Sequence, residues 1–284
     1  MAEECRIVTQ DGLSLGATLF SPKGPPKAGV IINSATAVKQ GYYAEFAKFL
    51  AKNGYLVVTY DYRGIGKSAV ANQRDSRLSM SAWGEYDLAT VIDWSTGQYK
   101  SLTWHCVGHS VGGQIIGFAD NNTQLASVYC VSSQSGYWGH WGLRQRPKIL
   151  FAWFAMIPLL SNILGQVPGL FLGGESLPAG VARQWAYWGR HKDYIVDQRG
   201  SPVRDGFSRL ECNMKFLYID DDIDFAPLQA VKALKAFYCN ANTEIKIVNA
   251  KAVDTKPIGH FGFFKTRYED SLWRDALGWL NTAA

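Results

Sequence analysis

Residues 102–119 read Leu-Thr-Trp-His-Cys-Val-Gly-His-Ser-Val-Gly-Gly-Gln-Ile-Ile-Gly-Phe-Ala, with one serine, Ser110, at the centre. The pattern before the serine predicts a buried β-strand over 102–108, and the pattern after it predicts a helix over 111–119. Gly108 and Gly112 leave room for the strand and the helix to approach each other. A Gly-x-Ser-x-Gly turn between a strand and a helix holds its serine hydroxyl clear of the backbone. We therefore predict that Ser110 is a nucleophile.

The backbone around this turn can supply hydrogen-bond donors to a reacting carbonyl oxygen. The first N–H groups of a helix have no partner within the helix, and its dipole is positive at that end. The N–H of Val111 can therefore face a developing oxyanion. The second donor should come from the loop at 33–38, Asn-Ser-Ala-Thr-Ala-Val. Our candidate is the N–H of Ala35, with Thr36 as the alternative.

A serine hydroxyl is a weak nucleophile without an adjacent base. The chain has five histidines. His105 lies inside the strand before the serine, and His109 is expected to point away from it. His140 and His191 fall in an irregular segment. His260 lies in the glycine-flanked loop 257–262, after the last predicted strand, which makes it the predicted base.

The third member of such a site is a carboxylate that orients the imidazole, and in chain order it lies between the serine and the histidine. Residues 220–224 read Asp-Asp-Asp-Ile-Asp and follow a predicted strand. Asp222 is the first choice, because it leaves a short loop before the helix that Pro227 is expected to open. Asp224 is the second choice and Asp221 the third.

Strand and helix patterns alternate along most of the chain. Asp11-Gly12 joins the first two strands as a hairpin turn. Alternation of this kind predicts an α/β fold with a mostly parallel, eight-stranded sheet and helices on both faces. The alternation breaks at 134–205, which we interpret as an inserted helical lid above the carboxyl edge of the sheet. The expected core domain is therefore 1–133 with 206–284. The predicted strands are 5–9, 13–20, 29–33, 55–60, 102–108, 125–132, 215–219 and 244–248, and the predicted helices are 42–52, 80–96, 111–119, 227–238 and 267–280.

Together these motifs resemble the α/β-hydrolase superfamily. Residues 61–68, Asp-Tyr-Arg-Gly-Ile-Gly-Lys-Ser, and 41–47, Gly-Tyr-Tyr-Ala-Glu-Phe-Ala, are similar to its serine aminopeptidase and monoacylglycerol-lipase-like branch. Residues 177–182 and 258–264 resemble a little-characterised group of bacterial α/β hydrolases. The resemblance implies the α/β-hydrolase fold and a Ser–Asp–His triad, but no substrate. Asn33-Ser34 stands where this branch usually has His-Gly, which leaves the second oxyanion donor open.

The inserted segment is rich in aromatic residues. We interpret Trp138, Trp141 and Trp185 as the walls of a pocket for an apolar acyl or aromatic group. The alternatives are a small core within the lid or a contact in a homodimer. A helix lying on a membrane is a third alternative, although no lysine-rich polar face accompanies it.

Other classes of protein fit the sequence poorly. The five cysteines form no Cys-x-x-Cys pair, so we expect neither a disulfide framework nor a metal site. The net charge of +5 is spread along the chain, without the basic block of a nucleic-acid-binding protein. Residues 64–68 end like a phosphate-binding loop, but Asp61 replaces its first glycine. The apolar run 149–160 is too short to span a bilayer and is interrupted by Pro158. The N-terminus lacks the pattern of a signal peptide, so we expect a soluble, cytoplasmic protein.

The combined expectation is a cofactor-independent serine hydrolase. Its small-molecule substrate would be a carboxylic ester, thioester or amide, cleaved through an acyl-enzyme on Ser110. An acyltransferase or a carbon–carbon bond hydrolase could use the same residues, and a non-catalytic binding protein could retain them.

Overall fold

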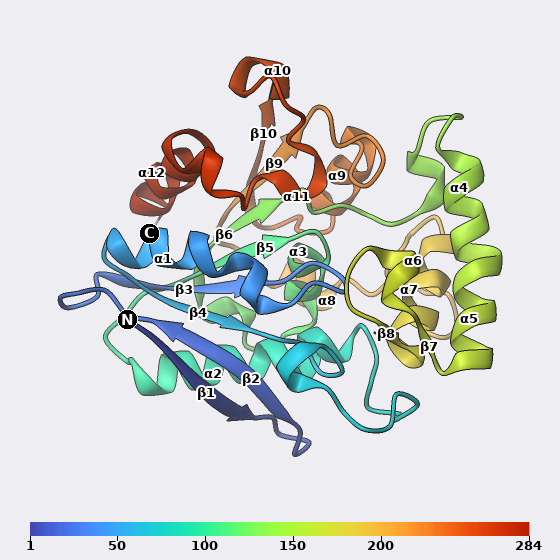
Figure 1. Ribbon diagram of the computed structural model, residues 1–284, viewed down its shortest axis with the longest axis horizontal. Helices are drawn as coiled ribbons and strands as arrows, with labels where there is room; N and C mark the ends of the chain where they lie inside the picture. Colours follow the sequence, from blue (N-terminus) through green and yellow to red (C-terminus); the bar gives the residue numbers. More distant parts are fainter. Residues whose placement is uncertain (284) are drawn as a thin grey trace.

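The computed structural model describes residues 1–283, and its centre is an eight-stranded sheet with the order β1-β2-β4-β3-β5-β6-β9-β10 (Figure 1). Strand β2 is antiparallel to both of its neighbours, and the other neighbouring pairs are parallel. The predicted sheet is therefore confirmed. The strands are β1 (Ala2–Val8), β2 (Ser14–Phe20), β3 (Ala28–Asn33), β4 (Tyr55–Tyr60), β5 (Trp104–His109), β6 (Leu125–Val131), β9 (Asn213–Ile219) and β10 (Asn242–Val248).

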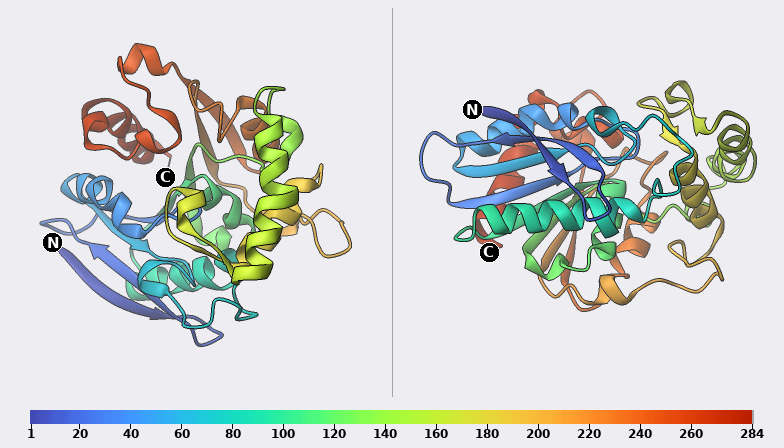
Figure 2. Two further views of the ribbon diagram at one scale, coloured as in Figure 1. Left: turned by 45° about the vertical axis from the view of Figure 1, so that its right-hand side comes forward. Right: turned by 90° about the horizontal axis from the view of Figure 1, so that it is seen from below.

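Helices cover both faces of the sheet, as the view from below shows (Figure 2). In the fully buried strand β3, Val30 and Ile32 face one hydrophobic core while Ile31 faces the other. Strands buried on both sides in this way are typical of parallel sheets. Helices α1 (Ala44–Lys52) and α12 (Arg274–Thr282) pack on the first core, and α2 (Ala89–Gln98), α3 (Val111–Gln114) and α9 (Leu228–Lys235) pack on the second.

Several predicted helices are shorter or less regular than their patterns suggested. The helix after Ser110 ends at Gln114 and continues as the 3₁₀ turn Ile115–Phe118, where Asn122 Nδ2 donates to the carbonyl oxygen of Ile116. The remaining short elements are the 3₁₀ turns Gln40–Tyr43, Gly66–Ser68, Asn122–Gln124, Trp138–His140 and Thr266–Tyr268, the π turns Trp83–Leu88 and Glu269–Trp273, and the helices α8 (Asp205–Ser208), α10 (Ala250–Val253) and α11 (Gly259–Gly262).

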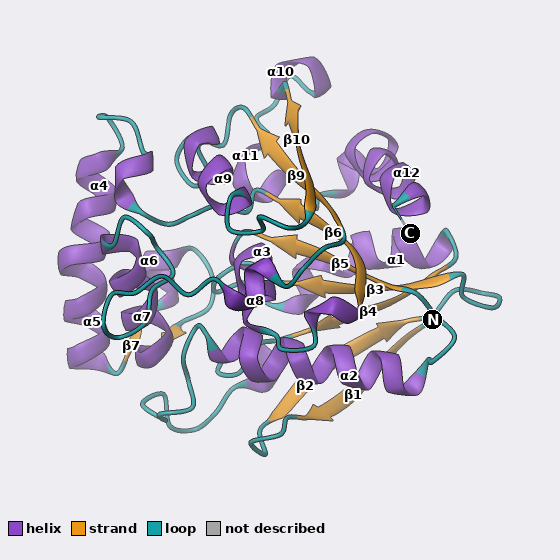
Figure 3. Ribbon diagram, turned by 180° about the vertical axis from the view of Figure 1, so that it is seen from behind, coloured by secondary structure: helices purple, strands orange, loops and turns teal. Residues whose placement is uncertain are grey.

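The segment inserted between β6 and β9 lies at the end of the sheet toward which the parallel strands point (Figure 3). Ligands bind at this edge in open α/β sheets. Its position therefore agrees with the interpretation as a lid, which remains a prediction. The segment contains α4 (Arg146–Phe151), the π turn Ala152–Met156, α5 (Ile157–Leu164), β7 (Gln166–Val167), α6 (Gly169–Leu172), β8 (Leu177–Pro178) and α7 (Ala179–Arg190).

The predicted interruption at Pro158 is wrong. Helices α4 and α5 are joined by the π turn into one continuous helix from Arg146 to Leu164. Proline lacks an N–H and clashes with the carbonyl of the preceding turn of a helix. It is tolerated in a first turn and where a π turn changes the hydrogen-bond pattern. Here Pro158 lies in the first turn of α5, directly after the π turn. By length and composition alone this helix is long enough to cross a membrane.

The Asp-x-Arg-Gly motif after β4 fixes a loop rather than supplying reactive groups. The Arg63 side chain is fully buried and donates from Nε to Asp87 at 2.7 Å and from Nη1 to Asp11 at 2.8 Å. Asp61 accepts the backbone N–H groups of Gln40 and Lys67. Because a buried charge needs a partner, these pairs hold the loop after β4 in one arrangement.

Candidate active site

Ser110 occupies the sharp turn between β5 and α3 in a strained backbone conformation. Its φ is 53° and its ψ is −116°, a region that residues with a side chain seldom adopt. A Cβ on Gly108 would lie 2.7 Å from the backbone carbonyl carbon of Gly112, and a Cβ on Gly112 would lie 2.4 Å from the carbonyl oxygen of Asn33. Both glycines are therefore required by the close approach of strand and helix. The strain at Ser110 agrees with a functional role.

The predicted base and acid are in direct contact. His260 Nδ1 lies 2.7 Å from Asp222 Oδ2, and both side chains are buried. The carboxylate accepts the Nδ1 proton, which leaves the lone pair on Nε2. Ser110 and His260 line the same cavity. The structure thus brings together the three residues that the sequence singled out from distant parts of the chain.

The neighbouring aspartates have different roles. Asp221 accepts the backbone N–H groups of Ile258 and Gly259, each at 2.8 Å, and so holds the loop that carries the histidine. Asp220 accepts the N–H of Ala250, also at 2.8 Å. The side chain of Asp224 is exposed. Of the three candidates from the sequence, only Asp222 contacts the imidazole.

The assignment of Ala35 as an oxyanion donor needs correction. Its N–H donates to the hydroxyl oxygen of Tyr43 at 2.7 Å, so it does not point into the cavity as a free donor. Thr36, the alternative, lines the cavity beside Ser110, and its N–H makes no hydrogen bond within residues 1–283. Val111 begins α3 directly after the serine, as expected. The geometry therefore favours Val111 and Thr36 as the donor pair.

A buried hydrogen-bond chain lies behind the site. His109 Nε2 contacts the carbonyl oxygen of His260 at 2.9 Å, and because a carbonyl only accepts, Nε2 carries the proton. Nδ1 then accepts the hydroxyl proton of Tyr43 at 2.9 Å, while the Tyr43 oxygen accepts the N–H of Ala35. Burial lowers the pKa of His109 well below its ordinary value and keeps the ring neutral.

The sequence did not predict these hydrogen bonds. It indicated only that His109 points away from the serine. The hydrogen bonds join three segments that carry the site: the loop after β3, the turn after β5 and the loop that holds His260. The only signal available was the histidine next to the serine, since its partner Tyr43 is distant along the chain.

We expect Tyr43→Phe to leave the Ala35 N–H and the His109 Nδ1 without partners in a fully buried site. The free energy of unfolding should fall by about 2 kcal/mol or more, and kcat should fall by about tenfold or more as the site loosens. Denaturant titration and steady-state kinetics measure the two effects. The matched control is Tyr55→Phe, whose hydroxyl bonds the Asn281 side chain away from the serine. Equal effects of both variants on kcat would contradict this positioning role.

The cavity at Ser110 has a volume of about 220 Å³ and a largely apolar lining. Trp141 and Trp185 line it as predicted, and Trp153 joins them. Trp138 does not line it and instead packs against Tyr137 and Arg146, so its assignment to the pocket was wrong. Trp141 Nε1 donates to the carbonyl oxygen of Asp224 at 2.9 Å, which ties the inserted segment to the loop of the acid.

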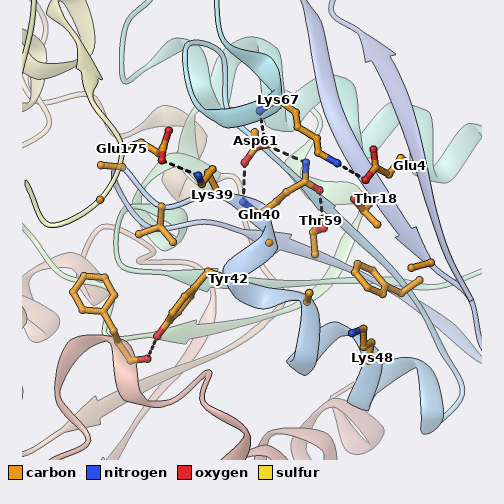
Figure 4. A pocket seen from close by; sticks show the side chains of 18 of the residues that line it. Glu4, Thr18, Lys39, Gln40, Tyr42, Lys48, Thr59, Asp61, Lys67 and Glu175 are labelled. Atoms are coloured by element: carbon orange, nitrogen blue, oxygen red, sulfur yellow. Dashed lines mark hydrogen bonds and ion pairs between the residues drawn. The ribbon is translucent and has the colours of Figure 1, made fainter. Parts of the chain in front are cut away.

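A larger hollow of about 730 Å³ lies beside this cavity and shares Ala37 and Phe261 with it (Figure 4). Its charged groups all have partners. Lys39 pairs with Glu175 at 2.9 Å, Lys67 pairs with Glu4, and Lys48 pairs with Glu45 outside the hollow, while Asp61 accepts backbone N–H groups. Its lining holds no serine, cysteine or histidine. The larger volume therefore does not mark the candidate active site, since the groups for nucleophilic chemistry lie in the smaller cavity.

Comparison with known proteins agrees with this fold. A family model described as serine aminopeptidase S33 matches residues 24–157. No curated protein matches the sequence.

Solved structures resemble the whole chain. A thermostable carboxyl esterase from Bacillus coagulans is 14% identical with a TM-score of 0.66, covering 99% of this chain and 98% of its own. A soluble variant of monoglyceride lipase from Saccharomyces cerevisiae is 14% identical with a TM-score of 0.65, covering 100% and 95%. An esterase from Exiguobacterium antarcticum is 15% identical with a TM-score of 0.61, covering 99% and 100%. With the sheet topology, these likenesses show that the chain has the α/β-hydrolase fold.

Proposed function

We propose that this protein is a serine hydrolase that cleaves carboxylic esters through an acyl-enzyme on Ser110. The observation that carries the proposal is the buried contact between His260 and Asp222 in the cavity that Ser110 lines. A serine, a histidine and an orienting carboxylate in this arrangement form a unit for acyl transfer. The similar structures include two esterases and a monoglyceride lipase, which supports the choice of an ester.

The proposed reaction uses Nε2 of His260 as the base, because Nδ1 is hydrogen-bonded to Asp222. Nε2 of His260 takes the hydroxyl proton of Ser110 as the oxygen attacks the ester carbonyl. The N–H groups of Val111 and Thr36 stabilise the resulting oxyanion. When the tetrahedral intermediate collapses, Nε2–H protonates the departing alkoxide and the acyl-enzyme remains. Water then attacks the acyl-enzyme by the same steps, which releases the carboxylic acid and restores the serine.

The lining of the cavity favours an apolar acyl or aromatic group. Trp141, Trp153 and Trp185 face the space together with aliphatic side chains from α4 and α5. Burial of apolar substrate surface against such walls supplies binding without a charged partner. In this proposal the inserted segment is a lid that forms the wall of the cavity opposite Ser110.

Hydrolysis of p-nitrophenyl esters of graded acyl length tests the proposal. We expect a burst of p-nitrophenol followed by slower turnover, because the acyl-enzyme forms and then hydrolyses. Absence of release from every ester in the series would contradict ester hydrolysis. Release that requires an added alcohol, amine or thiol would identify an acyltransferase instead.

The same ester series tests the lid. Trp185→Ala enlarges the cavity, so we expect kcat/KM to shift toward longer acyl groups by about tenfold relative to the shortest ester. The matched control is Trp138→Ala, which removes an equally large side chain of the same segment outside the cavity. An identical change of preference in both variants would argue against a pocket formed by Trp185.

A further inference from the structure

The helix from Arg146 to Leu164 exposes an unusually apolar surface. Only 17% of its most apolar window is buried. We call Phe151, Phe154, Leu159 and Ile163 the outer face of this helix, and their exposed fractions are 61%, 53%, 59% and 65%. An apolar patch of this kind on a folded protein is typical of an interaction surface.

The charged residues of the segment that carries this helix are all basic. Between Asp120 and Glu175 the sequence contains no acidic residue, while Arg144, Arg146 and Lys148 cluster at the start of the helix. Arg144 and Lys148 are exposed. The guanidinium of Arg146 bonds only to carbonyl oxygens, those of Trp141 and Gly139, so its charge is not neutralised there.

We propose that the outer face binds an anionic lipid surface, with the helix lying along that surface. Exposed apolar side chains enter the boundary between headgroups and acyl chains, and adjacent basic side chains meet the negative headgroups. A second copy of the chain fits less well, because a two-fold contact would face like charges against each other without an acid in the segment to pair with them.

The position of the helix links such a surface to the cavity. Its inner side contributes Ile149, Ala152 and Met156 to the lining of the Ser110 cavity, and the exposed Lys148 lies at the edge of the same lining. A helix with its side chains is about 10 Å across, so binding through the outer face would hold the cavity roughly that distance from the lipid. The binding itself does not rest on the proposed function, since it is measured without turnover.

The test is flotation of the full-length protein with vesicles of phosphatidylcholine, alone or with added phosphatidylglycerol. We expect the anionic vesicles to bind about tenfold more tightly, and high salt to remove most of that difference. Leu159→Ser/Ile163→Ser should weaken binding to anionic vesicles by about tenfold or more. Arg144→Gln/Lys148→Gln should reduce the preference for anionic vesicles while leaving the weaker binding to phosphatidylcholine.

The matched control is Ile247→Ser, which removes a side chain with the same 59% exposure as Leu159 from strand β10. Phe151→Ser is a second variant of the outer face, in case the double variant does not fold. Equal binding of the wild type and all outer-face variants would overturn the proposal. A wild-type dimer that dissociates on Leu159→Ser/Ile163→Ser, measured by sedimentation equilibrium, would also overturn it in favour of a second copy.

Discussion

Ser110→Ala is expected to lower kcat for ester hydrolysis by about a millionfold, the loss typical of removing the nucleophile from a triad that acts as a unit. The variant should also lose covalent labelling by a fluorophosphonate, which reacts with activated serines. Substrate binding should persist, because the apolar walls of the cavity do not depend on the hydroxyl. The decisive measurement is the intact mass after labelling, together with the burst amplitude on a p-nitrophenyl ester.

The backbone at Ser110 provides an internal check on this result. Alanine keeps the Cβ and therefore keeps the strain of a φ of 53°. Ser110→Gly removes the Cβ and with it the strain, so we expect the free energy of unfolding to rise by about 1 kcal/mol. The loss of activity should be the same as in Ser110→Ala. Ser135→Ala, at a buried serine outside the cavity lining, is the control that should retain labelling. Undiminished labelling of Ser110→Ala would place the nucleophile elsewhere.

The sheet and the three central residues were predictable because their signals are local or depend on chain order. The parallel strands inside the sheet are short, mostly buried runs, as in the six buried residues of β3. The serine turn carries its own glycines, and the base and acid follow from position relative to the last two strands. The hydrogen bond to Ala35 was not predictable, because its acceptor Tyr43 belongs to the next helical segment and reaches back over the loop.

The inserted segment shows a second limit. An aromatic residue can face a cavity, a small core or solvent, and composition does not distinguish these cases. Trp138 and Trp141 lie three residues apart, yet only Trp141 lines the cavity. The sequence also did not predict that the helix continues through Pro158, since the π turn before the proline has no clear sequence pattern. Tertiary packing decides both.

Asp222→Asn should lower kcat by about 10⁴-fold, the size of effect found when a triad carboxylate becomes an amide. The carboxylate accepts the Nδ1 proton of His260 and stabilises the imidazolium that forms during attack. If the amide oxygen faces Nδ1, the negative charge is lost and the buried amide nitrogen occupies the place of Oδ1, which has no partner within residues 1–283. If the amide nitrogen faces Nδ1, the ring must carry its proton on Nε2, and it can no longer accept one from the serine.

The other aspartates of the cluster make the assignment of the acid testable within one loop. Asp224 is exposed and lines the Ser110 cavity, but it makes no hydrogen bond to His260 within residues 1–283. We therefore expect Asp224→Asn to change kcat by less than about tenfold, far less than Asp222→Asn. Asp221→Asn keeps one acceptor oxygen for the two N–H groups of Ile258 and Gly259, and it should lower stability together with a moderate loss of kcat. The three variants are thus ordered by where each carboxylate lies: against the imidazole, against the backbone of its loop, or at the solvent-exposed edge of the cavity. A larger loss in Asp224→Asn than in Asp222→Asn would reverse that order and transfer the role of the acid.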